Sequence, residues 1–129
     1  MTEKTRTVNA EFMHYALKRV WMANGASEEH GEAVASALLI GMRQGKLNQG
    51  LGVYEAIDLA FQQGLLDIAA EPEVVGEGPT WAMIDGKMSS GYWTLTKMAH
   101  LAIAKAKEQG ISIVFGANSF VVVLRFLLV

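Results

Sequence analysis

The sequence contains no cysteine among its 129 residues. This absence excludes disulfide bonds, thiolate metal sites and cysteine nucleophiles, and it fits a cytoplasmic protein. An excess of one charge is also lacking, because 11 basic residues stand against 13 acidic ones and the net charge is −2. A chain with this balance has no field that would attract phosphate backbones or anionic lipids. We therefore expect no nucleic-acid partner.

A hydrophobic run long enough to cross a membrane is missing too. The most apolar stretch, Phe120 to Val129, is ten residues long and is interrupted by Arg125, whereas a spanning helix needs about 20 residues. Met1 to Asn9 is polar and lacks the apolar region of a secretory signal. These features predict a cytoplasmic protein without a membrane span.

The rest of the composition is that of a folded globular protein. Hydrophobic residues make up 51% of the chain and charged residues 19%, which favours a packed core. The length predicts a single domain over residues 1–129, since a domain usually takes about 100 to 200 residues. Gly76 to Pro79 is more typical of a hairpin loop than of a linker. We expect Trp21, Trp81 and Trp93 to lie in the core.

Helical periodicity gives way to short strand patterns along the chain. The predicted helices lie between Asn9 and Gly25, between Ser27 and Gly45, from Leu51 to Gln63 and from Gly91 to Gln109. The predicted strands are Glu73–Gly76, Thr80–Ile84 and Ile111–Phe115. Either Ser89 or Ser90 is expected to cap the longest helix. Strand, helix and strand over residues 80–115 form a βαβ-like unit. The sequence therefore predicts a mixed α/β fold in which N-terminal helices pack on a small sheet.

Glycine motifs that bind phosphate are not complete in this sequence. Gly76 and Gly78 begin a GxG pattern, but Trp81 stands at the third glycine position and a strand follows, where the dinucleotide-binding fingerprint must open a helix. Gly41 to Lys46 has three residues between its glycines where a Walker loop needs four. The sequence thus carries neither a dinucleotide-binding fingerprint nor a P-loop.

Histidine and serine patterns do not predict a metal site or a serine nucleophile. His14, His30 and His100 lie on three different predicted helices, and none stands in an HExxH frame. We expect His30 in an exposed first turn and His100 half-buried against the sheet. Ser119 has no GxSxG elbow around it, and its role stays open.

Several short segments follow one another in a characteristic order. They are Arg43–Gly50, Gln63–Leu66, Pro72–Val75, Ala82–Gly86, Ala104–Gly110 and Ile111–Ser119. This order resembles the N-terminal third of the malate/L-lactate dehydrogenase family, which also includes ureidoglycolate dehydrogenase and diketogulonate reductase. The resemblance covers about residues 8–119. It implies a homodimeric oxidoreductase that moves hydride between NAD or NADP and a small 2-hydroxy or 2-oxo acid, in a fold without the usual dinucleotide fingerprint.

The resemblance also implies site residues. The family histidine that exchanges a proton with the substrate oxygen corresponds to Gln49, whose amide cannot exchange that proton but can orient a carbonyl. The family arginine four residues later, a carboxylate clamp, corresponds to Val53, which has no charge for bidentate pairing. The further substrate-binding candidates are Asn48, Gly50, Asn118 and Ser119.

The sequence departs from the family pattern after Asn118 and Ser119. Phe120 to Val123 stand where the family continues into Asn-His and a glycine-containing loop, so the resemblance implies that the second family histidine and most of the cofactor site are missing. We expect a truncated, frame-shifted or diverged member that is inactive alone and does not bind NAD or NADP by itself. The alternative is a non-catalytic module that dimerises or binds a partner. Residues 120–129 have the profile of either a buried strand or an aggregation-prone one, and we expect oligomers.

Overall fold

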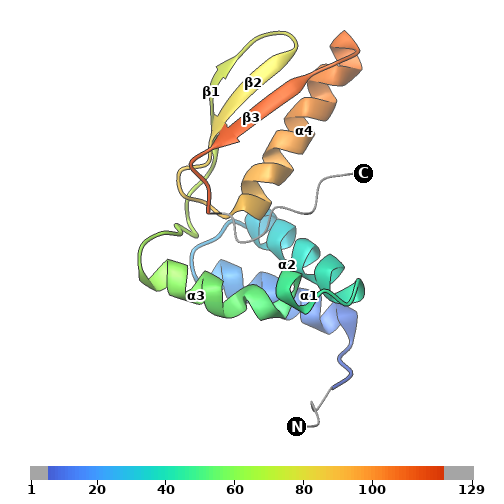
Figure 1. Cartoon of the computed structure of the whole chain (residues 1–129), viewed down its shortest axis with the longest axis vertical. Coiled ribbons are helices and arrows are strands. Elements are labelled where there is room, and N and C mark those ends of the chain that lie inside the picture. Colours follow the sequence, from blue (N-terminus) through green and yellow to red (C-terminus); the bar gives the residue numbers. More distant parts are fainter. Residues whose placement is uncertain (1–5, 121–129) are drawn as a thin grey trace.

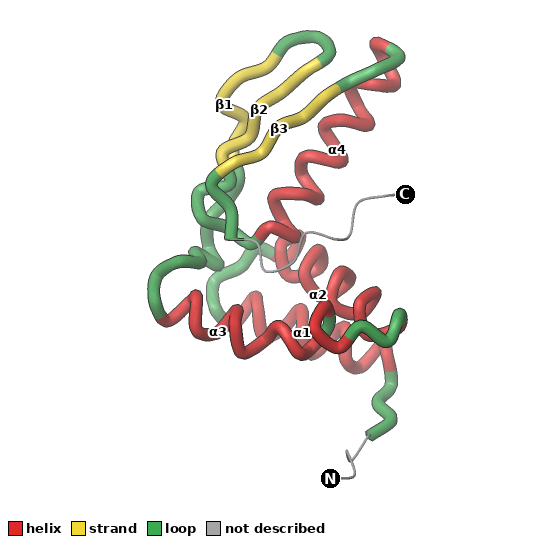
Figure 2. Tube along the Cα trace, in the orientation of Figure 1, coloured by secondary structure: helices red, strands yellow, loops and turns green. Residues whose placement is uncertain are grey.

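The computed structural model describes residues 6–120, which form a helical part and a sheet part (Figure 1). The helical part contains α1 (Ala10–Ala23), α2 (Glu28–Arg43) and α3 (Tyr54–Gln62), and two short 3-10 turns, η1 (Leu47–Gln49) and η2 (Leu51–Val53), connect α2 to α3. The sheet part contains β1 (Glu73–Glu77), β2 (Trp81–Asp85), α4 (Gly91–Gln109) and β3 (Ile113–Ala117). The predicted mixed α/β fold is confirmed, and Figure 2 shows the two parts by secondary structure.

The helices begin and end at residues suited to those positions. The Asn9 side chain accepts a hydrogen bond from the Phe12 N–H at 3.0 Å, and Ser27 accepts one from the His30 N–H at 3.3 Å. Of the two candidate caps of α4, Ser90 is the one that accepts from the Trp93 N–H. Gly110 ends α4 with a φ of 84°, a left-handed conformation that glycine adopts without strain.

The helical part is built on an antiparallel pair of helices. His14 of α1 contacts Ser36 of α2, whereas Lys18, one turn later in α1, contacts Glu28, two turns earlier in α2. Leu38 and Val34 are fully buried at this pair. The core of the helical part consists of Leu17, Trp21, Ala26, Val34, Ala35, Leu38, Val53, Ile57, Ala60, Leu66 and Ile68. This core joins α1, α2 and α3 into one packed layer.

The sheet has the strand order β1-β2-β3, with β1 and β2 antiparallel and β2 and β3 parallel. The predicted βαβ-like unit is therefore present as β2, α4 and β3. Ala82 and Ile84 are buried on one face of β2, and Gly116 of β3 lies against Met98 of α4. Alternate residues of a strand point to opposite faces, so α4 covers one face. The N-terminal helices meet this unit mainly through the contact of α2 with α4.

Four side chains lie in environments that differ from the expectation. Trp81 is 43% exposed, because it lies on the sheet face that α4 does not cover. Ile103, an apolar residue of the predicted helix from Gly91 to Gln109, is 53% exposed on α4. His30 is fully buried and His100 is exposed, the reverse of the expectation. His30 is buried because it contacts Ser90 of α4.

Candidate functional site

Gln49 is held in place by the end of α2. Its side chain is only 6% exposed, and its N–H donates to the Lys46 carbonyl at 2.9 Å. A Cβ on Gly41 would overlap the Gln49 carbonyl oxygen and lie 3.0 Å from the Gly50 nitrogen. The glycine in α2 thus allows η1 to approach the helix. The Gln49 Oε1 atom is buried and has no hydrogen-bond partner within the part of the chain that the structure describes.

The neighbours of Gln49 differ in their access to solvent. Asn48 is exposed, whereas Gly50 is buried against Met42 of α2. Val53, at the position of the family arginine, is 4% exposed and belongs to the hydrophobic core of the helical part. A charged clamp in this position would point into the core. The segment therefore offers an amide carbonyl at Gln49 and no cation for a substrate carboxylate.

Asn118 and Ser119 tie the end of β3 to the connection between β2 and α4. Asn118 adopts a left-handed conformation with a φ of 58°, and its Nδ2 donates to Asp85 Oδ1 at 2.9 Å. The Lys87 N–H and the Asn118 amide together hold the pKa of Asp85 below its usual value. The Ser119 hydroxyl donates to Thr94 Oγ1 at 2.8 Å. These hydrogen bonds give both residues a structural role.

The two groups of predicted site residues lie at opposite ends of α2. Gln49 packs at Gly41, in the last turns of that helix. Ser119 contacts Thr94 in the first turn of α4, where the neighbouring Ser90 contacts His30 in the first turn of α2. Eleven residues separate His30 from Gly41, which is about 16 Å along a helix axis. The structure therefore does not bring the Gln49 group and the Asn118 group together.

A buried cluster around His30 is the polar centre that the sequence did not reveal. His30 Nε2 lies 2.7 Å from Ser90 Oγ. The imidazole lies between two indoles, with its ring centre 5.1 Å from Trp21 and 5.8 Å from Trp93, and it stacks on Trp93. Burial lowers the pKa of His30 to about 4, and the Glu71 carboxylate opposes this shift. His30 is therefore neutral at pH 7.

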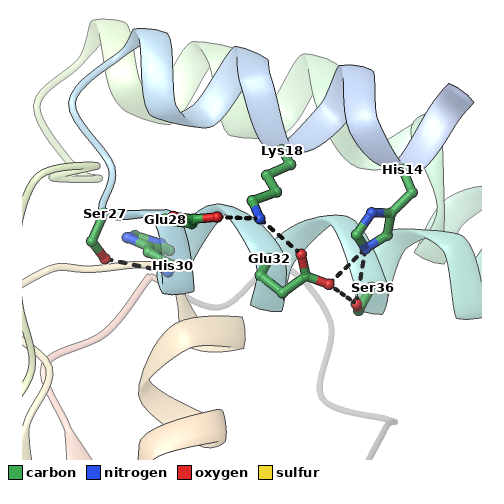
Figure 3. A network of polar contacts seen from close by, with 7 residues as sticks. All are labelled: His14, Lys18, Ser27, Glu28, His30, Glu32 and Ser36. Carbon is green, nitrogen blue, oxygen red and sulfur yellow. Dashed lines mark hydrogen bonds and ion pairs between the residues drawn. The ribbon is translucent and has the colours of Figure 1, made fainter. Parts of the chain in front are cut away.

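A second histidine belongs to an ion-pair network between α1 and α2 (Figure 3). His14 Nε2 lies 2.9 Å from Glu32 Oε1 and 3.2 Å from Ser36 Oγ. In a catalytic triad the acid and the serine contact different nitrogens of the imidazole, but here both contact the same one. Lys18 pairs with Glu28 at 2.9 Å and with Glu32 at 3.3 Å. These partly exposed pairs hold α1 to α2 and do not form a nucleophile.

A groove of about 1230 Å³ runs between α2 and α4. Small and apolar side chains form much of its lining, including Ala33, Ala37 and Ile40 of α2 and Leu95 and Ala99 of α4. Binding sites for small molecules usually have about 300–1,000 Å³. No residue of the Gln49 or Asn118 groups lines this groove, so the predicted site and the groove do not coincide.

The turn between β2 and α4 is where a strand leads into a helix N-terminus, the usual place for a dinucleotide phosphate. Three N–H groups of this turn are already used, because Gly86 donates to Ala117, Met88 to Asn118 and Gly91 to Phe120. These residues therefore do not fit a pyrophosphate. Residues 6–120 also contain no group of three His, Asp or Glu side chains that could hold a metal ion. None of the helices in this range has the length and hydropathy required to cross a bilayer.

Comparisons with known proteins agree with the fold and the segment order. The family model described as malate/L-lactate dehydrogenase matches residues 8–122. Malate dehydrogenase of Pyrococcus horikoshii is 32% identical over 101 residues, which are 78% of this chain and 28% of the relative. Sulfolactate dehydrogenase of Methanocaldococcus jannaschii has a similar structure, with a TM-score of 0.82 and 26% identity over 87% of this chain and 33% of that one. Malate dehydrogenase of Entamoeba histolytica has a TM-score of 0.83 at 24% identity, over 90% and 32% of the two chains. The chain spans about a third or less of these proteins.

Proposed function

Because the chain belongs to the malate/L-lactate dehydrogenase family, we propose that it is related in function to the NAD(P)-dependent oxidoreductases of small 2-hydroxy and 2-oxo acids. The named relatives are dehydrogenases of malate and sulfolactate, which supports a small hydroxy acid as the substrate class. In this proposal the chain is a single domain of such an enzyme, in the cytoplasm. The chain does not complete the reaction by itself.

The observation that carries this proposal is the side chain at position 49. Hydride transfer to a 2-oxo acid needs a proton for the new hydroxyl oxygen, and the donor must titrate near the working pH. Gln49 is buried and has no titratable proton, and its Oε1 accepts no hydrogen bond from residues 6–120. Val53 supplies no cation, and the N–H groups of Gly86, Met88 and Gly91 before α4 are bonded within the chain and not available to a cofactor phosphate. This set of residues fits a chain that does not reduce a small 2-oxo acid by itself.

The test is an assay of the purified 129-residue chain with NADH or NADPH and a panel of small 2-oxo acids. We expect no loss of nicotinamide absorbance beyond a control without protein, while Pyrococcus horikoshii malate dehydrogenase serves as the positive control. Gln49→His restores a titratable group, and we expect this variant to stay inactive because the clamp and cofactor contacts are still missing. Steady turnover by the unaltered chain would refute the proposal that the chain does not complete the reaction by itself. Turnover by the Gln49→His variant alone would show that the residue at position 49 is the only defect.

A second candidate function is a non-catalytic interaction module that forms homo-oligomers. The open face of the sheet favours it, since Trp81, Met83, Ile113 and Phe115 are each between 43% and 55% exposed on neighbouring strands. Grouped exposed apolar residues are typical of interaction sites. We expect Phe115→Lys to lower the sedimentation coefficient of an oligomer. The matched control is Leu59→Lys on α3, where the side chain is 54% exposed. Equal effects of both variants would argue against this face.

A further inference from the structure

The helical part and the sheet part meet at the first turns of α2 and α4 (Figure 1). His30 and Ser90 form the polar contact at this point, and their side chains are buried, at 0% and 3% exposure. Ser90 also accepts the N–H of Trp93 as the cap of α4. The next residue, Gly91, donates to the Phe120 carbonyl at 2.7 Å. One contact therefore connects α2, α4 and the segment that follows β3.

The charged groups around His30 are already paired with one another. Glu71 Oε2 accepts from Trp93 Nε1 at 3.0 Å and from Lys97 Nζ at 2.8 Å. Lys97 also lies 4.9 Å from the centre of the Trp93 ring. From α1, the residue facing His30 is the indole of Trp21. A positive charge on His30 would therefore lie between two indoles, with Lys97 nearby and with its nearest carboxylate already engaged.

From this geometry we propose that the His30–Ser90 contact is a pH-sensitive joint, and that protonation of His30 loosens the helical part from the sheet part while each keeps its secondary structure. An isolated buried charge is costly, and opening the joint gives the imidazolium access to water. The low pKa of His30 agrees with this reasoning. The helical part has its own core and the sheet part is held by α4. Tyr92 and Phe120, which pack against the helical core, keep the parts in contact.

The test measures the distance between the two parts directly. Because the sequence has no cysteine, Glu55→Cys on α3 and Lys107→Cys on α4, both at exposed positions, provide the only two sites for spin labels. We expect one narrow distance distribution at pH 7 and a shifted or broadened one near pH 4, where His30 takes up its proton, with the far-UV circular dichroism unchanged. His30→Gln keeps a hydrogen-bonding side chain and does not titrate, so its distribution should not respond to acid. His100→Gln, at an exposed histidine, should respond as the unaltered chain does.

Three results would overturn the proposal. The distribution could stay narrow down to pH 4, it could change equally in His30→Gln, or it could change only together with a loss of helical signal, which would be unfolding. An independent measurement covers the case in which His30→Gln does not fold. The imidazole resonances of the three histidines can be titrated in the unaltered chain, and the distance change must follow the His30 resonance. A change that follows His14 or His100 contradicts the proposal.

Discussion

Gly41→Ala tests whether η1 is held against α2 as the structure shows. Gly41 is buried inside α2, where alanine would normally stabilise a helix by about 1 kcal/mol relative to glycine. Here the added Cβ would overlap the Gln49 carbonyl oxygen and lie 2.6 Å from the carbonyl carbon. Both are main-chain atoms, so they cannot move aside by a change of rotamer. Packing against η1 therefore opposes the gain in helix propensity.

The size of the effect follows from these two contributions. Inserting a methyl group into a packed site costs about 1–3 kcal/mol, and a main-chain overlap belongs at the upper end of that range. After the gain of about 1 kcal/mol from helix propensity, we expect Gly41→Ala to lower the free energy of unfolding by about 1–2 kcal/mol. Gly50→Ala tests the same contact from the side of η2. Its Cβ would lie 2.5 Å from Met42 Cγ and 3.2 Å from the Met42 main-chain nitrogen, so we expect a loss of about 1–3 kcal/mol here as well.

Urea unfolding of the two variants measures these free energies, and hydrogen exchange locates the change. The amide of Gln49 donates to Lys46 and that of Val53 donates to Gly50, so both should lose protection in Gly41→Ala while the amides in the middle of α1 keep theirs. If Gly41→Ala is as stable as the unaltered chain, or more stable, helix propensity outweighs the overlap. That result would show that Gln49 does not pack against Gly41 of α2 as closely as the structure has it.

Three further variants test the core, the cap and the tail. Leu38→Ala, at a fully buried position, should lower the free energy of unfolding by about 2–5 kcal/mol. The control Ile40→Ala, at 47% exposure in the same helix, should lower it by less than about 1 kcal/mol. Urea unfolding measures both losses. Ser90→Ala removes the cap of α4 and the partner of His30 and should cost about 2 kcal/mol, while Ser36→Ala, a partly exposed serine, should cost little in the same assay. Deleting residues 121–129, which lie outside the described residues, should shift oligomers toward monomer in sedimentation velocity. Phe120 is kept because its main chain forms hydrogen bonds with Ser89 and Gly91. A monomer peak that is the same with and without these residues contradicts this expectation.

Local signals in the sequence were sufficient to predict the elements of this fold. Caps at Asn9 and Ser27 and the glycine at 110 act within a few residues of the chain, and the structure has them in those roles. The strand and helix order over residues 80–115 predicted the parallel pairing of β2 with β3, because a parallel pair needs a long crossover. The sequence places alternate side chains of β2 on opposite faces of the sheet, but it does not show which of these faces α4 covers. That choice decided the exposure of Trp81.

The parts of the site that the sequence did not predict depend on contacts between distant residues. His30 looked like a solvated residue in a first turn because no local pattern indicates that α4, 60 residues later, abuts it. The contact of Gly41 with Gln49 could not be predicted from the sequence, since a glycine can occur in a helix for many different reasons. The segment order predicted which residues to examine, namely Gln49 and Asn118, but their separation along α2 follows from how η1 and β3 pack.

The buried His30 also makes a prediction about stability and acid. Its pKa is lowered to about 4 in the folded chain and is about 6.5 in an unfolded one, so between these values the unfolded state binds more protons. The contribution of His30 is complete above about pH 6.5 and is lost as the pH falls toward 4. At roughly 1.4 kcal/mol for each pH unit of the difference, the loss is about 2 kcal/mol at pH 5 if the joint stays closed.

Opening of the joint limits this loss, because a protonated His30 that reaches water no longer destabilises the folded chain. A domain of this size is usually stable by about 5–15 kcal/mol, so a loss of about 2 kcal/mol from His30 does not by itself unfold the chain. Urea unfolding at a series of pH values between 7 and 4 measures the loss, with His30→Gln expected to remove it and His100→Gln to leave it unchanged. Identical pH profiles for the unaltered chain and His30→Gln would show that the imidazole is not buried as a neutral group. Protonation of His30 would then supply no free energy to open the joint.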